Sequence, residues 1–160
     1  MAMLYVMVGI PGSGKSYEAQ KIVDSHTGPI TYISRDEVRL ATITDQDYYF
    51  SKEDEVYDKF IKLIAEQLAA GNDVIADATH MSRGSRRKLI ESLAREGMCM
   101  NKYDITYVCM NTPLEVCIER DSHRTGRRHV TEPVIRRMAK ALSMPTVKEF
   151  SNVKEVIVRG

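Results

Sequence analysis

The sequence predicts an α/β fold in which a parallel sheet of about five strands lies between helices on both faces. Five short apolar runs alternate with six longer stretches that can form helices, and a glycine-rich segment follows the first run. Strands that alternate with helices are joined by right-handed crossovers, which favour a parallel sheet. The chain has 160 residues, which fits a single domain over 1–160 that buries roughly 70% of the surface of its unfolded chain.

Each element is bounded by a change in residue type. The expected strands are dominated by Val, Ile, Tyr and Met and lie at 4–8, 30–33, 73–76, 103–110 and 153–158. The expected helices fill 15–24, 36–42, 51–70, 84–96, 113–123 and 132–143. Glycine or proline marks the stops, at Gly28-Pro29, Gly71-Asn72, Gly97 and Pro145. The polar and basic segment 125–131 is expected to be a mobile lid, which reaches with its flanking helix ends over about 120–137.

Composition limits the classes of protein that the chain can belong to. Hydrophobic residues make up 43% of it and charged residues 28%, and no apolar run approaches the ~20 residues that span a bilayer. The first strand begins within three residues of the N-terminus, so no secretory signal is expected and we predict a cytoplasmic protein. The three cysteines form no close pair, which fits reduced thiols. The net charge of +1 leaves nucleic-acid binding to a local patch, and residues 120–140 are basic whereas 45–58 are acidic.

Residues 9–16 read Gly-Ile-Pro-Gly-Ser-Gly-Lys-Ser, which matches the phosphate-binding loop pattern. Glycines let triphosphate oxygens approach backbone N–H groups, and the helix that follows begins with unpaired donors. Lys15 would reach the β and γ phosphates, and Ser16 would reach Mg²⁺. We therefore predict binding of ATP and Mg²⁺, with nucleotide contacts from Gly9, Pro11, Gly12, Ser13, Gly14, Lys15, Ser16 and Tyr17.

A second candidate site follows the second strand, where 34–39 read Ser-Arg-Asp-Glu-Val-Arg. Ligands of open α/β sheets bind at the carboxyl ends of the strands. Asp36 and Arg39 are three residues apart, so a helical first turn places a carboxylate and a guanidinium on one side. This pair suits a general base with an anion clamp. The alternative is that Asp36 stabilises the helix N-terminus and Arg39 pairs with it or with Glu37 on a solvated face.

A third candidate site follows the third strand, at Asp77-Ala78-Thr79-His80. Asp77 could hold Mg²⁺ through water or orient an acceptor, or it could cap a helix or a turn. His80 could contact substrate or cap the next helix, and the sequence does not decide between them. The basic residues of 83–88, Arg86 among them, could contact phosphates, although a solvated helix face explains them as well.

A fourth candidate site is formed by Arg120 and Arg124, four residues apart at the end of an expected helix. Transfer of a γ-phosphoryl group spreads charge over its oxygens, and arginines carried by a lid stabilise that charge. The helix macrodipole alone also favours arginine at this end. Arg127 and Arg128 lie on the expected lid.

Together these four sites resemble the kinase domain of 5′-polynucleotide kinases of the bacteriophage type, within the wider zeta-toxin and chloramphenicol-phosphotransferase-like group of phosphate-loop kinases. The resemblance covers most of the chain. It depends on the loop at 9–16, on Ser-Arg-Asp-Glu-Val-Arg at 34–39, on Asp-Ala-Thr-His at 77–80 followed by Arg86 and Arg87, and on Arg120 and Arg124 before Val130 and Ile135.

The resemblance implies a three-layer P-loop kinase fold and attack of a nucleic-acid 5′-hydroxyl on the γ-phosphate of ATP. Asp36 would be the general base, and Arg39 would hold the phosphate next to the terminal nucleoside. Lys15, Arg120 and Arg124 would neutralise the moving phosphoryl group, and Ser16 and Asp77 would support Mg²⁺. The predicted acceptor contacts are Asp36, Arg39, Asp77, Thr79, His80 and Arg86. The predicted partner is single-stranded or end-exposed nucleic acid.

Two features depart from the family. His80 stands where this group usually carries Asn, and the chain ends at Gly160 without a 3′-phosphatase domain, so a separate phosphatase or ligase is expected in the same pathway. Two other functions stay open. One is phosphorylation of a small hydroxyl compound such as a nucleoside, sugar or antibiotic on the same fold, and the other is a nucleotide-binding regulatory module.

Overall fold

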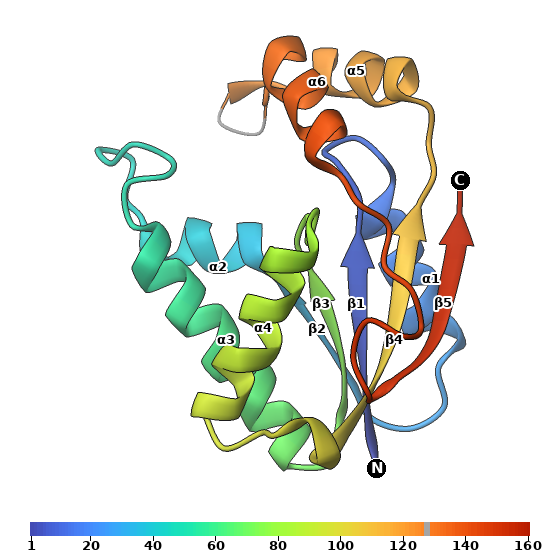
Figure 1. The fold of residues 1–160 in the computed structure, drawn as a ribbon. Coiled ribbons are helices and arrows are strands. Elements are labelled where there is room, and N and C mark those ends of the chain that lie inside the picture. Colours follow the sequence, from blue (N-terminus) through green and yellow to red (C-terminus); the bar gives the residue numbers. More distant parts are fainter. Residues whose placement is uncertain (127–128) are drawn as a thin grey trace.

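The computed structural model describes residues 1–126 and 129–160. Its sheet has five parallel strands in the order β2-β3-β1-β4-β5 (Figure 1). The strands are β1 (Ala2–Val8), β2 (Ile30–Ser34), β3 (Asp73–Asp77), β4 (Tyr103–Met110) and β5 (Val153–Arg159). The predicted α/β class and the predicted P-loop kinase architecture are confirmed.

Six α-helices lie in the described part of the chain, where the sequence predicts them. They are α1 (Lys15–Ser25), α2 (Arg35–Thr42), α3 (Glu53–Ala69), α4 (Arg83–Arg95), α5 (Leu114–Ser122) and α6 (Glu132–Ala141). Every predicted strand and helix end lies within two residues of the end in the structure. A short 3₁₀ helix, η1 (Met100–Lys102), was not predicted.

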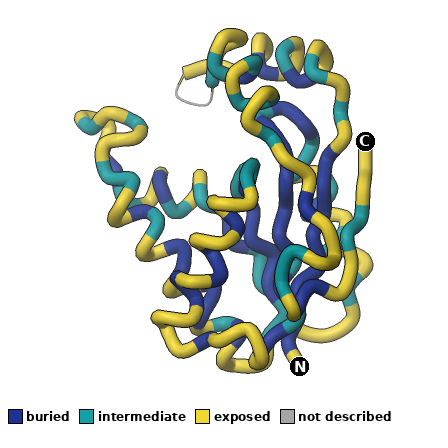
Figure 2. Tube along the Cα trace, viewed as in Figure 1, coloured by how far each residue is buried: buried dark blue, intermediate teal, exposed yellow. Residues whose placement is uncertain are grey.

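The sheet is covered on both faces because successive side chains of a strand point to opposite sides. In β1, Leu4, Val6 and Val8 belong to the cluster that α3 and α4 complete. Met7 belongs to a second cluster, which contains Ala19 of α1. The buried strands and the exposed outer surfaces of the helices are apparent in Figure 2. Helix, sheet and helix thus form three layers.

A third cluster joins the loop after β1 to α5 and α6 through Ile10, Cys117 and Ile135. Figure 1 shows α5 and α6 at the end of the sheet where the strands terminate, next to this loop. Since all five strands are parallel, the segments that follow β1, β2, β3 and β4 reach the same edge of the sheet. In the described ranges, no helix is both long and apolar enough to cross a membrane.

Candidate functional site

The loop between β1 and α1 has a backbone that only glycine adopts easily at two positions. Gly12 and Gly14 have φ angles of 80° and 94°. A Cβ atom on Gly12 would also lie 2.5 Å from the backbone oxygen of Cys117. Glycine at position 12 therefore lets the loop pack against α5, and the two positive φ angles explain why glycine stands at both positions.

Two further observations fit a triphosphate at this loop. Helix α1 begins at Lys15 without a side-chain cap, so its first N–H groups have no side-chain partner. The buried Ser13 Oγ has no hydrogen-bond partner among the described residues. The donors present therefore suit an anion bound at the start of α1.

Lys15 lies within the same loop, where its Nζ donates a hydrogen bond to the Ile10 carbonyl oxygen at 3.1 Å. Burial lowers the pKa of Lys15, and the carboxylates of Asp77 and Asp36 oppose this shift. The Lys15 cation therefore feels the charge of both the candidate metal ligand and the candidate base.

Asp77, at the end of β3, connects the first and third candidate sites. Its residue is 6% exposed. Ser16 Oγ donates a hydrogen bond to Asp77 Oδ2 at 3.1 Å, and the Tyr32 hydroxyl donates to the same oxygen. Burial and this hydrogen bond raise the pKa of Tyr32, so its hydroxyl remains a donor. A hydroxyl beside a carboxylate is a ligand pair that suits Mg²⁺ bound together with phosphate oxygens and water. No cluster of three or more His, Cys, Asp or Glu ligands is found among the described residues.

Asp36 and Arg39 lie together on the first turns of α2, but Arg39 is not the free clamp that the sequence suggests. Its side chain is 6% exposed, and its Nη1 donates to Asp36 Oδ1. Its Nε and Nη2 donate to the two carboxylate oxygens of Glu53 at 2.7 and 2.5 Å. The predicted alternative, in which Arg39 pairs with Asp36, is therefore present, although the guanidinium is buried instead of solvated. Asp36 keeps a side chain that is 67% exposed.

Glu53 is a residue of this site that the sequence analysis did not identify. It opens α3, fourteen positions after Arg39, so no helical spacing relates the two residues. The hydrogen bond from Arg39 lowers the pKa of Glu53, which keeps the carboxylate ionised. Arg39 is thus fixed from one side by Glu53 and itself holds Asp36.

His80 does not reach the acceptor position, which corrects its predicted role as a substrate contact. It is 7% exposed, its Nδ1 donates to the Met7 carbonyl oxygen at 2.8 Å, and its ring stacks on Phe60. Its neighbour Thr79 lies at the strand edge as predicted, and the Thr79 carbonyl oxygen accepts a hydrogen bond from Gly9 N at 3.0 Å. The segment after β3 thus supports the phosphate loop through its backbone.

Arg86 is also corrected, because it is 1% exposed and has no free N–H group to offer an acceptor phosphate. Its Nε and Nη2 donate to the two Glu149 carboxylate oxygens at 2.7 and 3.0 Å. Its Nη1 donates to the carbonyl oxygens of His80 and Ser143, each at 2.9 Å, and its Nη2 also reaches Ser143 Oγ at 3.4 Å. Arg86 therefore joins α4 to the chain that follows α6.

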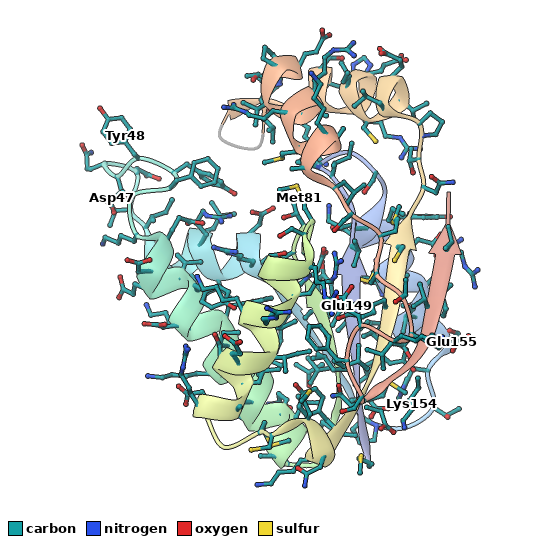
Figure 3. All side chains as sticks on the ribbon, in the orientation of Figure 1. Asp47, Tyr48, Met81, Glu149, Lys154 and Glu155 are labelled. Atoms are coloured by element: carbon teal, nitrogen blue, oxygen red, sulfur yellow. The ribbon has the colours of Figure 1, made fainter. Side chains whose placement is uncertain are left out.

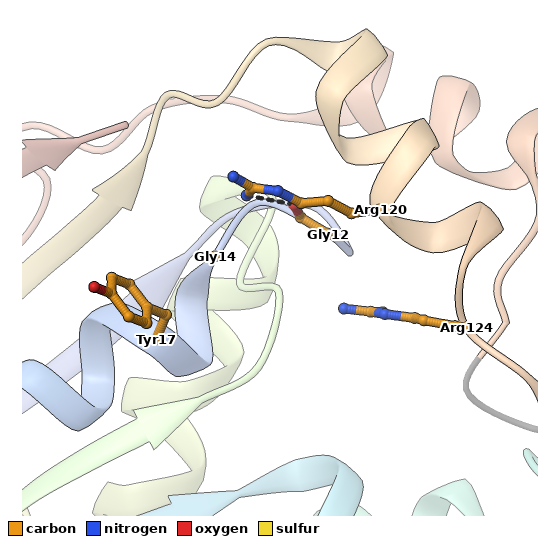
Figure 4. A pocket seen from close by; sticks show the side chains of 5 residues that line it. All are labelled: Gly12, Gly14, Tyr17, Arg120 and Arg124. Atoms are coloured by element: carbon orange, nitrogen blue, oxygen red, sulfur yellow. Dashed lines mark hydrogen bonds between the residues drawn. The ribbon is translucent and has the colours of Figure 1, made fainter.

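Arg120 and Arg124 are exposed beside the phosphate loop, as the sequence predicts. With Gly12, Gly14 and Tyr17 they line a cavity of about 410 Å³ (Figure 4). The Arg120 Nη1 donates to the Gly12 carbonyl oxygen at 3.1 Å. This brings two cations and three of the predicted nucleotide contacts to one cavity. The predicted lid residues Arg127 and Arg128 lie outside the described residues.

Asp121, next to Arg120, is a second residue that the sequence analysis missed. It is 1% exposed, and its carboxylate oxygens accept hydrogen bonds from the backbone N–H groups of Val130 and Thr131 at 2.8 and 2.9 Å. An acidic residue in the last turn of a helix opposes the macrodipole, which is a local signal that it has specific partners. Asp121 holds the segment before α6 against α5, and so fixes the surroundings of Arg120.

Replacing His80 by Asn is expected to remove an acid sensitivity of folding. Burial lowers the pKa of His80 to about 4, and Arg35 and Lys15 add to this effect. In the unfolded chain, the His80 imidazole binds a proton below the ordinary histidine pKa of about 6.5, whereas in the folded chain it stays neutral down to about pH 4. The contribution of neutral His80 to the free energy of unfolding is therefore fully present above pH 6.5 and falls by up to about 3 kcal/mol towards pH 4. Asn tolerates the φ of 45° found here. Urea unfolding of His80→Asn and of the wild type at pH 7 and pH 4.5 tests this, and an equal loss of stability in both proteins would contradict it.

Comparison with known proteins places this site in a family. A model of the family described as AAA domain matches residues 4–145. No curated protein matches the chain. Two structures of a Pnkp1/Rnl/Hen1 complex, the first described as an RNA repair complex, are similar to it. The first has a TM-score of 0.74 and 23% sequence identity, and the match covers 88% of this chain and 44% of the other. The second has a TM-score of 0.63 and 25% sequence identity, and the match covers 78% of this chain and 40% of the other.

A structure described as a sugar kinase from Janibacter sp. HTCC2649 is similar too, with a TM-score of 0.66 and 20% identity over 99% of this chain and 84% of that one. The present chain therefore spans less than half of the length of the Pnkp1-complex chains and most of the length of the sugar kinase. The match to the family model covers most of the chain, and the loop at 9–16 has the expected geometry. The chain therefore belongs to the AAA domain family and has the fold of P-loop kinases.

Proposed function

We propose that this kinase transfers the γ-phosphate of ATP to the 5′-hydroxyl group of DNA or RNA. The observation that carries the proposal is the exposed Asp36 carboxylate, which Arg39 and Glu53 orient at the same sheet edge as Lys15 and Asp77. The similarity to a chain of an RNA repair complex supports nucleic-acid 5′ ends as the substrate. In that case a separate phosphatase or ligase would act in the same pathway.

In the proposed reaction, Asp36 accepts the proton of the 5′-hydroxyl while the hydroxyl oxygen forms a bond to the γ-phosphorus. The bond from the γ-phosphorus to the β-γ bridging oxygen breaks, and ADP leaves with that oxygen. Lys15, Arg120 and Arg124 stabilise the charge on the transferred group. Ser16 and Asp77 would hold Mg²⁺, which when bound neutralises β and γ oxygens. The protein therefore supplies a base, cations and alignment.

A second candidate is phosphorylation of a small hydroxyl compound. The observation that favours it is the ion pairing of Arg39, because two carboxylates already neutralise the guanidinium that would anchor an acceptor phosphate. The similarity to a sugar kinase over most of both chains points the same way.

One labelling experiment separates the two candidates. The protein is incubated with Mg²⁺ and γ-labelled ATP beside a 5′-hydroxyl oligonucleotide, its 5′-phosphorylated twin, and a pool of nucleosides and sugars. Label on the 5′-hydroxyl oligonucleotide and not on its twin is expected. Label confined to the small compounds would overturn the proposal in favour of the second candidate.

Substitution of Arg39 by Ala is expected to change both kinetic constants of the acceptor. The kcat falls for every acceptor because Asp36 loses its Nη1 donor. Asp36 and Glu53 occupy three of the five N–H groups of Arg39, so two remain that can donate to an acceptor phosphate. The acceptor KM is therefore expected to rise about 5- to 30-fold more for a nucleoside 3′-phosphate than for the same nucleoside without phosphate, which is the effect of one charge-assisted hydrogen bond of about 1–2 kcal/mol. Steady-state kinetics with both acceptors checks this. An equal rise for the two acceptors would show that Arg39 only positions Asp36.

A further inference from the structure

Three aromatic residues follow one another in the loop between α2 and α3, and we refer to Tyr48, Tyr49 and Phe50 as the aromatic loop. Tyr48 is 88% exposed and Phe50 is 65% exposed. Figure 3 shows Tyr48 at the tip of this loop, which stands out from α2 and α3 at the same end of the molecule as α5 and α6. The sequence analysis gave these residues no role. Two large exposed rings two residues apart make the loop a candidate contact surface.

The aromatic loop is continuous with the candidate base. The Tyr49 hydroxyl donates a hydrogen bond to Asp36 Oδ1 at 3.3 Å. The Arg39 guanidinium lies 4.9 Å from the Tyr49 ring centre and 5.0 Å from that of Phe50. The two rings meet edge to face with centres 4.9 Å apart. The loop is therefore fixed to the residues that would meet the acceptor hydroxyl, and the exposed part of Phe50 lies beside them.

Charge around the loop selects an uncharged ring over a phosphate. Residues 50–55 line a cavity of about 430 Å³, and the three carboxylates of Glu53, Asp54 and Glu55 outnumber the one ammonium group, that of Lys52. Exposed arginines are found on the neighbouring helix α4, which packs on α3 with Lys88 Nζ 4.2 Å from the ring centre of Tyr57. Phosphates of a strand are therefore expected over Arg83 and Arg87 of α4, away from the carboxylates beside Phe50.

We propose that the aromatic loop is a stacking platform for the first bases of a single-stranded 5′-hydroxyl end, with Phe50 as its main surface. The inference rests on the proposed function, which it deepens by assigning the acceptor bases to a surface. Stacking suits an enzyme that accepts many sequences, because every base has a π face, and it contributes about 1–3 kcal/mol per base. Arg39 behind the rings adds a cation to the stack.

The test is a comparison of Phe50→Ala and Phe50→Trp with wild type on two 5′-hydroxyl oligonucleotides, one normal and one abasic at its first two nucleotides. Phe50→Ala is expected to raise the KM of the normal oligonucleotide about 5-fold or more and to leave that of the abasic one unchanged, whereas Phe50→Trp restores the wild-type KM. Leu63→Ala, at an exposed apolar residue elsewhere on α3, serves as the matched control and should change neither KM.

The outcomes distinguish the platform from the proposed function. A KM that Phe50→Ala leaves unchanged, or raises equally for both oligonucleotides, overturns the platform, because the effect would then act through Arg39 and Asp36 without any base. Wild-type protein that labels neither oligonucleotide overturns the proposed function, and the platform with it.

Discussion

Replacing Asp36 by Asn is expected to slow phosphoryl transfer about 10²- to 10⁴-fold, the usual contribution of a positioned general base. Asn has the shape of Asp and keeps an oxygen that can accept the hydrogen bond from Arg39 Nη1, so the arrangement with Glu53 is retained. What is lost is the capacity to take a proton. Single-turnover transfer from γ-labelled ATP measures the rate, and ATP affinity should stay at the wild-type value because Asp36 lies outside the phosphate loop.

A control for this substitution lies in the same turn of α2. Glu37 is exposed, and the carboxylates that pair with Arg39 are those of Asp36 and Glu53, so Glu37→Gln removes the same charge one residue away. Its transfer rate should equal that of wild type. If Asp36→Asn also retained the wild-type rate, the assignment of the base would be wrong. If both variants slowed equally, the effect would come from the charge of the helix terminus.

Replacing Arg86 by Met is expected to lower the free energy of unfolding by about 3–5 kcal/mol, because it leaves a buried carboxylate without its partner. The Glu149 side chain is 5% exposed and retains only the Tyr107 hydroxyl, 3.3 Å away, after the arginine is removed. The carbonyl oxygens of His80 and Ser143 lose a donor as well. Urea unfolding gives the change, and Arg87→Met, at an exposed arginine one position along α4, should stay within about 0.5 kcal/mol of wild type.

The double variant Arg86→Met/Glu149→Leu tests the reason for this loss. Replacing both members of a buried ion pair by apolar residues of similar volume is often nearly neutral, so the double variant should be more stable than Arg86→Met alone. A double variant that is as unstable as the sum of the two single variants would show that lost packing, and not the unpaired carboxylate, causes the effect.

The parts of the site that could be predicted are those that local sequence determines. The phosphate loop is a contiguous pattern, and Asp36 and Asp77 come directly after strands whose apolar runs are clear, so their position at one edge follows from a parallel sheet. Arg86 and His80 could not be assigned in this way. Both look like polar residues near a site, and their burial depends on Glu149 and Phe60, which are distant in sequence.

For Arg39, the pairing with Asp36 could be predicted from the sequence, whereas the burial of its side chain could not. Its spacing from Asp36 correctly predicted that the two side chains meet, because a helix places residues three apart on one face. Its burial came from α3 and the aromatic loop, which fold back over α2. Contacts between elements of this kind have no period in the sequence, so they emerge only in three dimensions.

The packing of the phosphate loop against α5 has a consequence for how the nucleotide leaves. The Gly12 backbone fits against Cys117 so closely that no Cβ could be added, Arg120 is bonded to the Gly12 carbonyl oxygen, and Asp121 ties the start of α6 to α5. A swing of α5 away from the phosphate loop would have to break the Gly12–Cys117 contact and the hydrogen bond from Arg120, and Asp121 would carry the segment before α6 along with α5. We therefore expect α5 to stay against the phosphate loop when a nucleotide leaves, so that movement of the Arg120 and Arg124 side chains opens the cavity instead.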